Sequence, residues 1–157
     1  MLRAGLETGD AVVGEMGTVH RVNYTVMGEP VATAARLEAL AKRYGVRTLV
    51  GETLVEEAKE SFLFRPVDTV RMGREGQPIR IFEMLGKLSA PGFEWVRDYE
   101  AAYLAWQERR FTDALVAFNV LARSRPDDAV VARYVARCTT CVTTPPPESW
   151  DEIYDAD

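Results

Sequence analysis

A few residues in this 157-residue chain have types and spacing suited to chemistry. Gly14 and Gly17 have the spacing of a turn that could cradle a phosphate, but no Gly-Lys-Ser/Thr sequence follows them, so an ordinary turn is favoured. His20 is the single histidine and falls in a predicted loop between strands, where an exposed turn residue is a better interpretation than a catalytic base. Neither feature alone predicts a catalytic site.

The two cysteines, Cys138 and Cys141, are too few for a disulfide framework. No His or Cys partners lie at the spacing that zinc sites use, so the pair is a weak metal signal. Two incidental thiols near a helix end are therefore favoured over a redox or metal role.

Thr25 and Arg36 lie on consecutive predicted elements. Residues 22–27 alternate apolar and polar side chains and predict a half-buried strand. From Pro30, apolar residues recur every three or four positions as far as Gly45, which predicts a helix with a glycine at its end. Taken alone, Thr25 would be a polar strand residue and Arg36 a solvated helix arginine.

The remaining elements of the first half are short. Residues 2–8 and 11–14 are predicted as two extended segments around a Gly-Asp turn, in a hairpin-like arrangement. Further strands are expected at residues 46–50, 64–72 and 79–85, with a short helix at residues 53–60 between the first two of them.

After Gly86 the composition changes, and residues 89–92 are typical of a linker. Amphipathic spacing then predicts helices at residues 99–109, 112–124 and 127–138, with Trp95 and Trp106 as packing anchors. The run Pro145–Pro147 predicts an extended tail, because successive prolines enforce polyproline conformation. Trp150 and Tyr154 are expected to hold that tail onto the body.

Bulk properties exclude several function classes. A net charge of -5 and a sequence pI near 5.0 argue against nucleic acid as a partner, because binding a phosphate backbone needs an excess of clustered Lys and Arg. The apolar runs are short and broken by charges, so no membrane segment or signal peptide is expected. The sequence predicts a cytoplasmic location, or the cytosolic end of a membrane-anchored sensor.

Several motifs in a fixed order resemble one protein family. Residues 9–38, GDAVVGEMGTVHRVNYTVMGEPVATAARLE, are similar to the second half of class III adenylate and guanylate cyclase domains, whose usual form is roughly TGxVVxGxxG, then DYTVxGDxVNLAARLE. The likeness continues through residues 44–46, 64–68 and 78–83, and so covers about residues 2–85.

The resemblance implies an α+β fold. It would be a partial nucleotide-cyclase (ferredoxin-like) sheet with covering helices, followed by a small all-α helical-repeat tail. We expect the C-terminal half of a cyclase domain at residues 1–86, a linker at 87–94, a tetratricopeptide-like helical segment at 95–141 and a Pro-rich extended tail at 142–157.

In this family, catalytic sites form at a dimer interface. There the ribose 3′-oxygen of a nucleoside triphosphate attacks the α-phosphate, and groups that stabilise the developing charge lower the barrier. By resemblance, Thr25 occupies the base-recognition position in the form that many bacterial adenylate cyclases show, and Arg36 that of the transition-state arginine. The expected substrate is an ATP-like nucleotide.

Two positions depart from the family pattern. Ala32 stands where the family has its transition-state asparagine, and alanine has no side-chain hydrogen-bond donor. Met72 stands where the family has a phosphate-binding lysine. Arg71 or Arg74 would substitute for that lysine only if the turn shifts.

The family's two metal-binding aspartates lie on strands that precede anything in this sequence, and Glu7, Asp10 and Glu15 do not match their motifs. Mg²⁺ or Mn²⁺ is therefore expected for the intact family domain, and no metal is expected to bind this chain alone. The resemblance further implies a homodimer or a missing N-terminal cyclase half as the partner.

Phe111, Ala114, Phe118 and Pro126 resemble the aromatic, small and proline positions of a tetratricopeptide repeat, in which a small Ala lets two helices approach closely. Together with residues 145–151, the helices resemble the C-terminal extension of bacterial sensor-linked adenylate cyclases. They are expected to pack on the cyclase half or on a protein partner.

Two functions remain open. One is the C-terminal part of an adenylate cyclase-like protein that makes cyclic AMP in signal transduction and is inactive in isolation. The other is a non-catalytic module in which the degenerate cyclase half and the helices bind a signalling partner.

Overall fold

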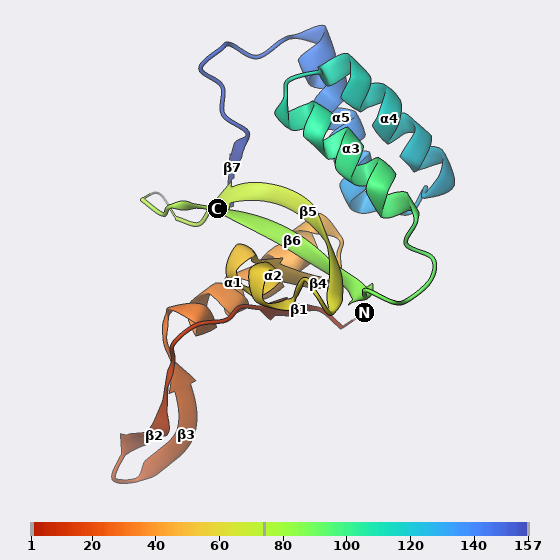
Figure 1. The fold of residues 1–157 in the computed structure, drawn as a ribbon. Coiled ribbons are helices and arrows are strands. Elements are labelled where there is room, and N and C mark those ends of the chain that lie inside the picture. Colours follow the sequence, from red (N-terminus) through yellow and green to blue (C-terminus); the bar gives the residue numbers. More distant parts are fainter. Residues whose placement is uncertain (1, 74, 157) are drawn as a thin grey trace.

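A mixed five-stranded sheet lies at the centre of the fold, in the order β1-β4-β6-β5-β7 (Figure 1). Its strands span Ala4–Leu6 (β1), Thr48–Gly51 (β4), Phe62–Arg71 (β5), Pro78–Lys87 (β6) and Ile153–Asp155 (β7). The computed structural model describes residues 2–73 and 75–156. β1 runs parallel to β4 and β7 parallel to β5, whereas β6 is antiparallel to both of its neighbours. The expected mixed α and β architecture is confirmed.

The first helix, α1 (Glu29–Tyr44), places one apolar face against this sheet and buries Leu37, Leu40, Ala41 and Tyr44. The helix ends where predicted, because Gly45 adopts the left-handed conformation (φ 70°) and its N–H donates to carbonyls of the last turn. A second, short helix, α2 (Glu52–Ala58), follows β4 directly, also in agreement with the sequence.

The opening of the chain differs from the predicted hairpin. β1 pairs with β4, while β2 (Val12–Thr18) pairs with β3 (Arg21–Met27) in a separate two-stranded antiparallel sheet. The prediction that residues 2–8 and 11–14 form a hairpin with each other is therefore wrong. β1 packs closely against α1. Only glycine fits at position 5 of β1, because a side chain there would collide with the backbone of Ala34 and Glu38.

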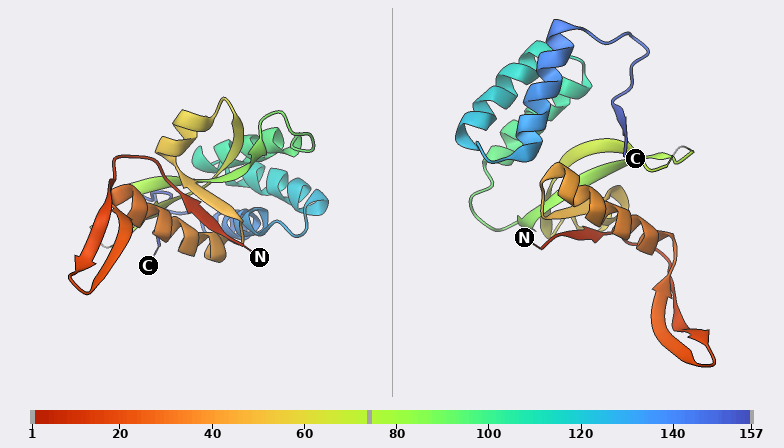
Figure 2. Two further views of the ribbon diagram at one scale, coloured as in Figure 1. Left: turned by 90° about the horizontal axis from the view of Figure 1, so that it is seen from below. Right: turned by 180° about the vertical axis from the view of Figure 1, so that it is seen from behind.

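The β2–β3 hairpin projects away from the rest of the molecule, on the side opposite the C-terminal helices (Figures 1 and 2). Its two-residue turn contains His20, which is exposed, as predicted. Because neither of its faces packs broadly on the body, the hairpin exposes Val12 (66%), Tyr24 (76%) and other apolar side chains.

Three helices form a layer next to β5: α3 (Trp95–Gln107), α4 (Phe111–Ser124) and α5 (Ala129–Thr143). Their aromatic side chains share one core with α1 and the sheet, and Trp106 is only 1% exposed. The hydroxyl of Tyr99 donates to the Pro66 carbonyl (2.6 Å) and that of Tyr134 to the Val67 carbonyl (2.7 Å). The expectation that these helices pack on the first half of the chain is confirmed.

A buried ion network fastens this helical layer to the sheet. Arg65 of β5 is 3% exposed and lies between Glu83 of β6 and Asp128, the N-cap residue of α5. Its guanidinium donates to Asp128 through two nitrogens (2.7 and 3.1 Å) and to Glu83 through Nε (2.8 Å). Charged groups this deeply buried remain ionised only when paired, so each partner depends on the others.

After α5 the chain returns to the sheet as an extended tail. Trp150 packs edge-on against Trp106, with ring centroids 5.4 Å apart, and Tyr154 lies beneath the guanidinium of Arg137. The predicted anchoring by Trp150 and Tyr154 is confirmed, whereas the short strand β7 was not predicted. Within residues 2–73 and 75–156, no helix is long and apolar enough to cross a membrane.

Candidate functional site

The site residues predicted from the sequence lie on several elements. Thr25 is on β3, Ala32 and Arg36 are on α1, Arg71 ends β5, and Met72 follows it directly. The sixth of them, Arg74, lies outside the described residues.

A cavity of about 320 Å³ brings two of these positions together. Arg36 enters it from α1 and Met72 from the end of β5. Arg43 of α1, Gly73 and Ala156 of the tail also line it, together with Ala39 and Leu40. The structure thus joins the positions that the family resemblance assigns to the transition-state arginine and the phosphate-binding lysine.

Thr25 is not among the residues that line this cavity. It faces Gly14 across the β2–β3 hairpin and is partly buried, while Ala32 is exposed on the first half of α1. The reason is the projection of the hairpin, which places β3 on a separate sheet from β5. The cavity therefore brings Arg36 and Met72 together, while Arg71 and the candidate for base contact, Thr25, are not among its lining residues.

Arg71 is already engaged within the chain. Its guanidinium forms an ion pair with Asp155 at 3.4 Å, and the two side chains are 34% and 76% exposed. The sequence did not predict this contact, because it depends on the pairing of β7 with β5. Arg71 therefore already has an anionic partner within the chain.

Arg43 was missed by the sequence analysis, although a signal existed. It follows Arg36 by two helical turns on α1, so both arginines lie on the same face of the helix. Its position in the last turn also suits the negative end of the helix dipole, which gives it a structural role as well. The Nη1 of Arg43 donates to the Ala156 carbonyl at 2.8 Å.

A second cavity, of about 550 Å³, is acidic and lies between the ends of β1 and β4 and the starts of α1 and α2. Glu7, Asp10, Glu29 and Glu52 line it, and Glu52 is paired with Arg80 at 2.8 Å. Even so, across the described ranges no group of three or more His, Cys, Asp or Glu side chains is arranged to hold a metal ion. These residues do not fit the ligand set that two-metal chemistry requires.

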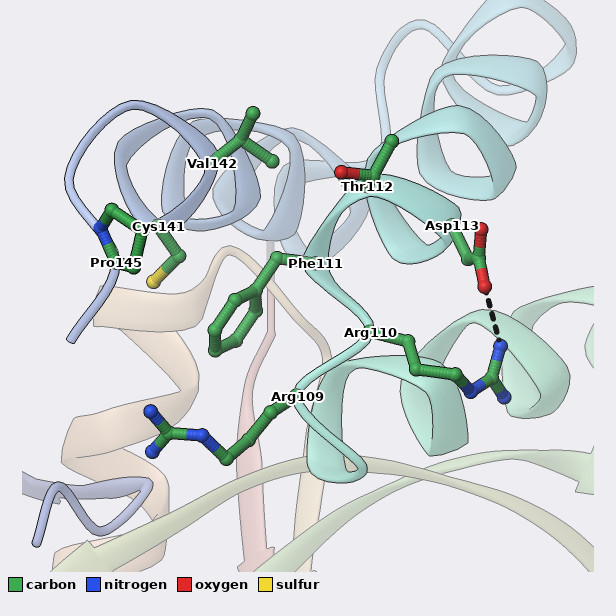
Figure 3. A pocket seen from close by; sticks show the side chains of 8 residues that line it. All are labelled: Arg109, Arg110, Phe111, Thr112, Asp113, Cys141, Val142 and Pro145. Carbon is green, nitrogen blue, oxygen red and sulfur yellow. Dashed lines mark hydrogen bonds and ion pairs between the residues drawn. The ribbon is translucent and has the colours of Figure 1, made fainter. Parts of the chain in front are cut away.

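A third cavity, of about 480 Å³, lies among the C-terminal helices (Figure 3). Figure 3 shows Arg110 turned towards Asp113, with which it forms an ion pair at 2.9 Å, and Cys141 close to Pro145. Burial raises the pKa of the Cys141 thiol and raises that of Cys138 to about 12. Because the thiolate is the reactive form, these cysteines are poor nucleophiles, which favours the interpretation of incidental thiols.

The chain is similar in sequence to curated adenylate cyclases, although no family model matches it. Adenylate cyclase 1 of Rhizobium meliloti is 38% identical over 88 residues, which cover 56% of this chain and 13% of that protein. The terminal-differentiation specific adenylate cyclase of Dictyostelium discoideum is 26% identical over 150 residues, which cover 89% of this chain and 7% of that protein. The chain thus spans only a small fraction of these relatives.

Two solved structures align with part of the chain. The adenylyl cyclase CyaB from P. aeruginosa aligns with a TM-score of 0.47 and 23% identity, over 56% of this chain and 44% of that one. The guanylate cyclase domain of RhGC from Catenaria anguillulae, solved with GTP, aligns with a TM-score of 0.44 and 19% identity, over 53% of this chain and 43% of that one.

Proposed function

We propose that this chain is the C-terminal part of an adenylate cyclase-like protein that converts ATP to cyclic AMP in intracellular signalling. The observation that carries this proposal is the shared cavity of Arg36 and Met72, two positions far apart in sequence that the family resemblance assigns to the phosphates. Such a role would place the chain in the cytoplasm, or at the cytosolic end of a membrane-anchored sensor.

In this proposal a partner completes the site, and the β2–β3 hairpin is the surface that meets it. The hairpin exposes apolar side chains on both faces, including Val13 (55%), Val22 (55%) and Met27 (55%). Contiguous apolar surface of this kind is typical of an interaction site. A second copy of the chain, or an N-terminal cyclase half, would cover it and bring nucleotide-binding groups towards Thr25.

The missing chemistry would come from the same partner. The intact domain would use Mg²⁺ or Mn²⁺, held by aspartates of an N-terminal half. Ala32 supplies no donor to the transition state, and the loss of one such donor lowers turnover by about 10²–10³ in well-studied enzymes. Met72 supplies no charge, so the chain alone is expected to make no measurable cyclic AMP.

The test is cyclic AMP formation from ATP and Mn²⁺ by the purified chain, alone and mixed with an N-terminal cyclase half. Activity is expected only in the mixture, and Arg36→Ala should lower it by about 10²-fold or more, because one group that stabilises transition-state charge is lost. Arg123→Ala is the matched control, since Arg123 is exposed on α4, far along the chain from the cavity. Zero product from every mixture would refute the proposal.

A non-catalytic interaction module is the second candidate. It is favoured by the substitutions at Ala32 and Met72 and by apolar side chains exposed on α3 and α4, among them Leu104 (51%), Val116 (61%) and Val120 (59%). In this version the helices, with their tetratricopeptide-like spacing, would bind a signalling protein. Calorimetric titration of an ATP analogue without metal separates the two, because only the cyclase proposal requires nucleotide binding that depends on Arg36.

A further inference from the structure

One face of α1 carries two arginines with an apolar stretch between them. Arg36, Ala39, Leu40 and Arg43 recur at the spacing of neighbours on a helix surface, so they form one stripe along α1. All four line the cavity of about 320 Å³ that also contains Met72. The two arginines are seven positions apart, which separates them by about 10.5 Å along the helix axis. The α1 wall of the cavity thus has a cation at each end and apolar side chains in the middle.

The other lining residues add apolar atoms but no charged group. Met72 and Gly73 follow β5, and Ala156 belongs to the tail, which returns to the sheet as β7 (Figures 1 and 2). Leu40 is only 6% exposed and is part of the main hydrophobic core, and Met72 packs against that core. The apolar part of the cavity is therefore held in place by the packing of the fold.

The charges of the two arginines are not neutralised by any carboxylate among residues 2–73 and 75–156. Arg43 donates through Nη1 to the Ala156 carbonyl at 2.8 Å, which is a neutral acceptor. Arg36 is exposed and takes part in none of the ion pairs between described side chains. An anion that enters the cavity would meet positive charge from both.

In the chain alone, this lining suits an anion with an apolar body better than a bare polyphosphate. A polyphosphate carries several charges, but Ala39, Leu40 and Met72 offer its oxygens no side-chain donor. A carboxylate needs one arginine, with which it forms bidentate, charge-assisted hydrogen bonds. The apolar side chains would then take the rest of the ligand out of water, which favours binding in proportion to the area buried.

We propose that this cavity binds a medium-chain aliphatic carboxylate, with its carboxylate group at Arg36 and its chain over Leu40 and Met72. Small-molecule sites commonly combine apolar walls with a few charged groups and measure about 300–1,000 Å³, so the cavity suits a small ligand. The binding site itself does not rest on the proposed function. Only a consequence does, because the ligand would compete with a nucleotide for Arg36 in a completed cyclase domain.

Calorimetry of the unaltered chain with acetate, hexanoate and octanoate tests the apolar half of the proposal. Affinity should rise about fourfold for each methylene group that the cavity buries, so octanoate should bind up to about 15-fold more tightly than hexanoate. Acetate has no chain to bury and should not bind measurably. Inorganic tripolyphosphate, as a probe with charge alone, should bind more weakly than octanoate.

Arg36→Gln tests the charged half. It should weaken octanoate binding about three- to fivefold, the value of an exposed ion pair. Arg47→Gln is the matched control, because Arg47 is exposed just beyond the end of α1 and does not line the cavity. Met72→Gln keeps the length of the side chain but makes the wall polar, so it should reduce the gain in affinity per methylene.

NMR locates the ligand. Octanoate should shift the amide signals of Ala39, Gly73 and Ala156 and leave those of the β2–β3 hairpin, which is also apolar and exposed, in place. Equal affinities for Arg36→Gln and Arg47→Gln, shifts confined to the hairpin, or tighter binding of tripolyphosphate than of octanoate would overturn the proposal.

The outcome can be told apart from that of the cyclase proposal. Octanoate binding that depends on Arg36, with no cyclic AMP from any mixture, would support this site and refute the cyclase proposal. Cyclic AMP from the mixture without octanoate binding by the chain would do the reverse.

Discussion

Replacing Asp128 by asparagine should destabilise the chain far more than the loss of a helix cap explains. Asp128 is 3% exposed at its side chain and accepts hydrogen bonds from Arg65, from Arg125 (3.1 Å) and from the amides of Val130 and Val131. Asparagine keeps an acceptor for the two amides, because it is as good an N-cap residue as aspartate. It removes the negative charge that faces the buried guanidinium of Arg65.

The expected magnitude follows from that geometry. Removing one partner of a buried ion pair costs about 3–5 kcal/mol, because the other charge is left in a poor environment. Arg65 keeps Glu83 at 2.6 Å, so the lower end applies and Asp128→Asn should cost about 3 kcal/mol. Asp128→Ala also removes the cap, which adds about 1 kcal/mol.

Urea unfolding at pH 7 measures both variants against the unaltered chain. The midpoint should fall with little change in slope, since the surface exposed on unfolding stays the same. If the stability of Asp128→Asn came within about 1 kcal/mol of that of the unaltered chain, the effect would be no larger than that of an exposed pair. The ion network would then not be what holds the helical layer to the sheet.

The same variant tests the sign of the pH dependence. Burial alone would raise the pKa of Asp128, but hydrogen bonds and charge from Arg65, with the Val131 amide, outweigh burial and pull the pKa below its ordinary value of 3.8. A depressed carboxylate pKa contributes stability that is present above 3.8 and is lost as the pH falls through the folded-state pKa. The stability difference between the unaltered chain and Asp128→Asn should therefore narrow in acid, and a widening would contradict the assignment.

Three further outcomes are expected. Tyr134→Phe leaves the Val67 carbonyl without its 2.7 Å donor, and urea unfolding should show a loss of about 1–2 kcal/mol. Gly45→Ala should lower the Tm, because alanine is strained by about 1 kcal/mol at φ 70° and its Cβ would lie 2.7 Å from that of Ala129. Burial raises the pKa of Cys138 to about 12, so its thiol should react slowly with iodoacetamide at pH 8 in the folded chain and readily in urea. Equal alkylation rates in the folded and unfolded chain would disprove the burial effect.

Local patterns in the sequence predicted local structure well. Helix α1 follows from apolar spacing between Pro30 and Gly45, and both of its ends depend on residues inside or next to the helix. Strand β3 follows from alternation over residues 22–27, which the structure extends by only one residue. The prediction that it is half-buried is wrong, because the hairpin projects from the body and exposes all of its residues but Thr25. Such elements need no knowledge of distant partners.

Pairing between distant segments could not be predicted in this way. Residues 4–6 have the same extended character whether they pair with the next segment or with β4, and the choice depends on the fit of Gly5 against α1. β7 has only three residues and follows a proline-rich stretch, so no periodicity marks it. Its position comes from the edge of β5 and from the aromatic surface that receives Trp150.

The candidate site, too, was predictable only where it depends on local motifs. Arg36 and Met72 were assigned from motifs, and the structure brings them to one cavity. The roles of Thr25, Arg36 and Arg71 in binding a substrate stay predictions. The contact between Arg71 and Asp155 could not be predicted from the sequence, because it requires the tail to return to the edge of β5.

Strand β5 connects the two halves of the chain in a way that bears on both proposed functions. Its middle residues receive hydrogen bonds from α3 and α5 at Pro66 and Val67, and Asp68 pairs with Arg137 of α5 at 2.7 Å. Its end leads directly to Met72 in the wall of the Arg36 cavity. A protein that binds the helices and shifts α5 must break or move these buried contacts, so its binding and ligand binding at the cavity would be thermodynamically coupled. Under either proposed function the helical layer would be coupled to the ligand cavity, so the interaction module and the catalytic fragment need not exclude each other.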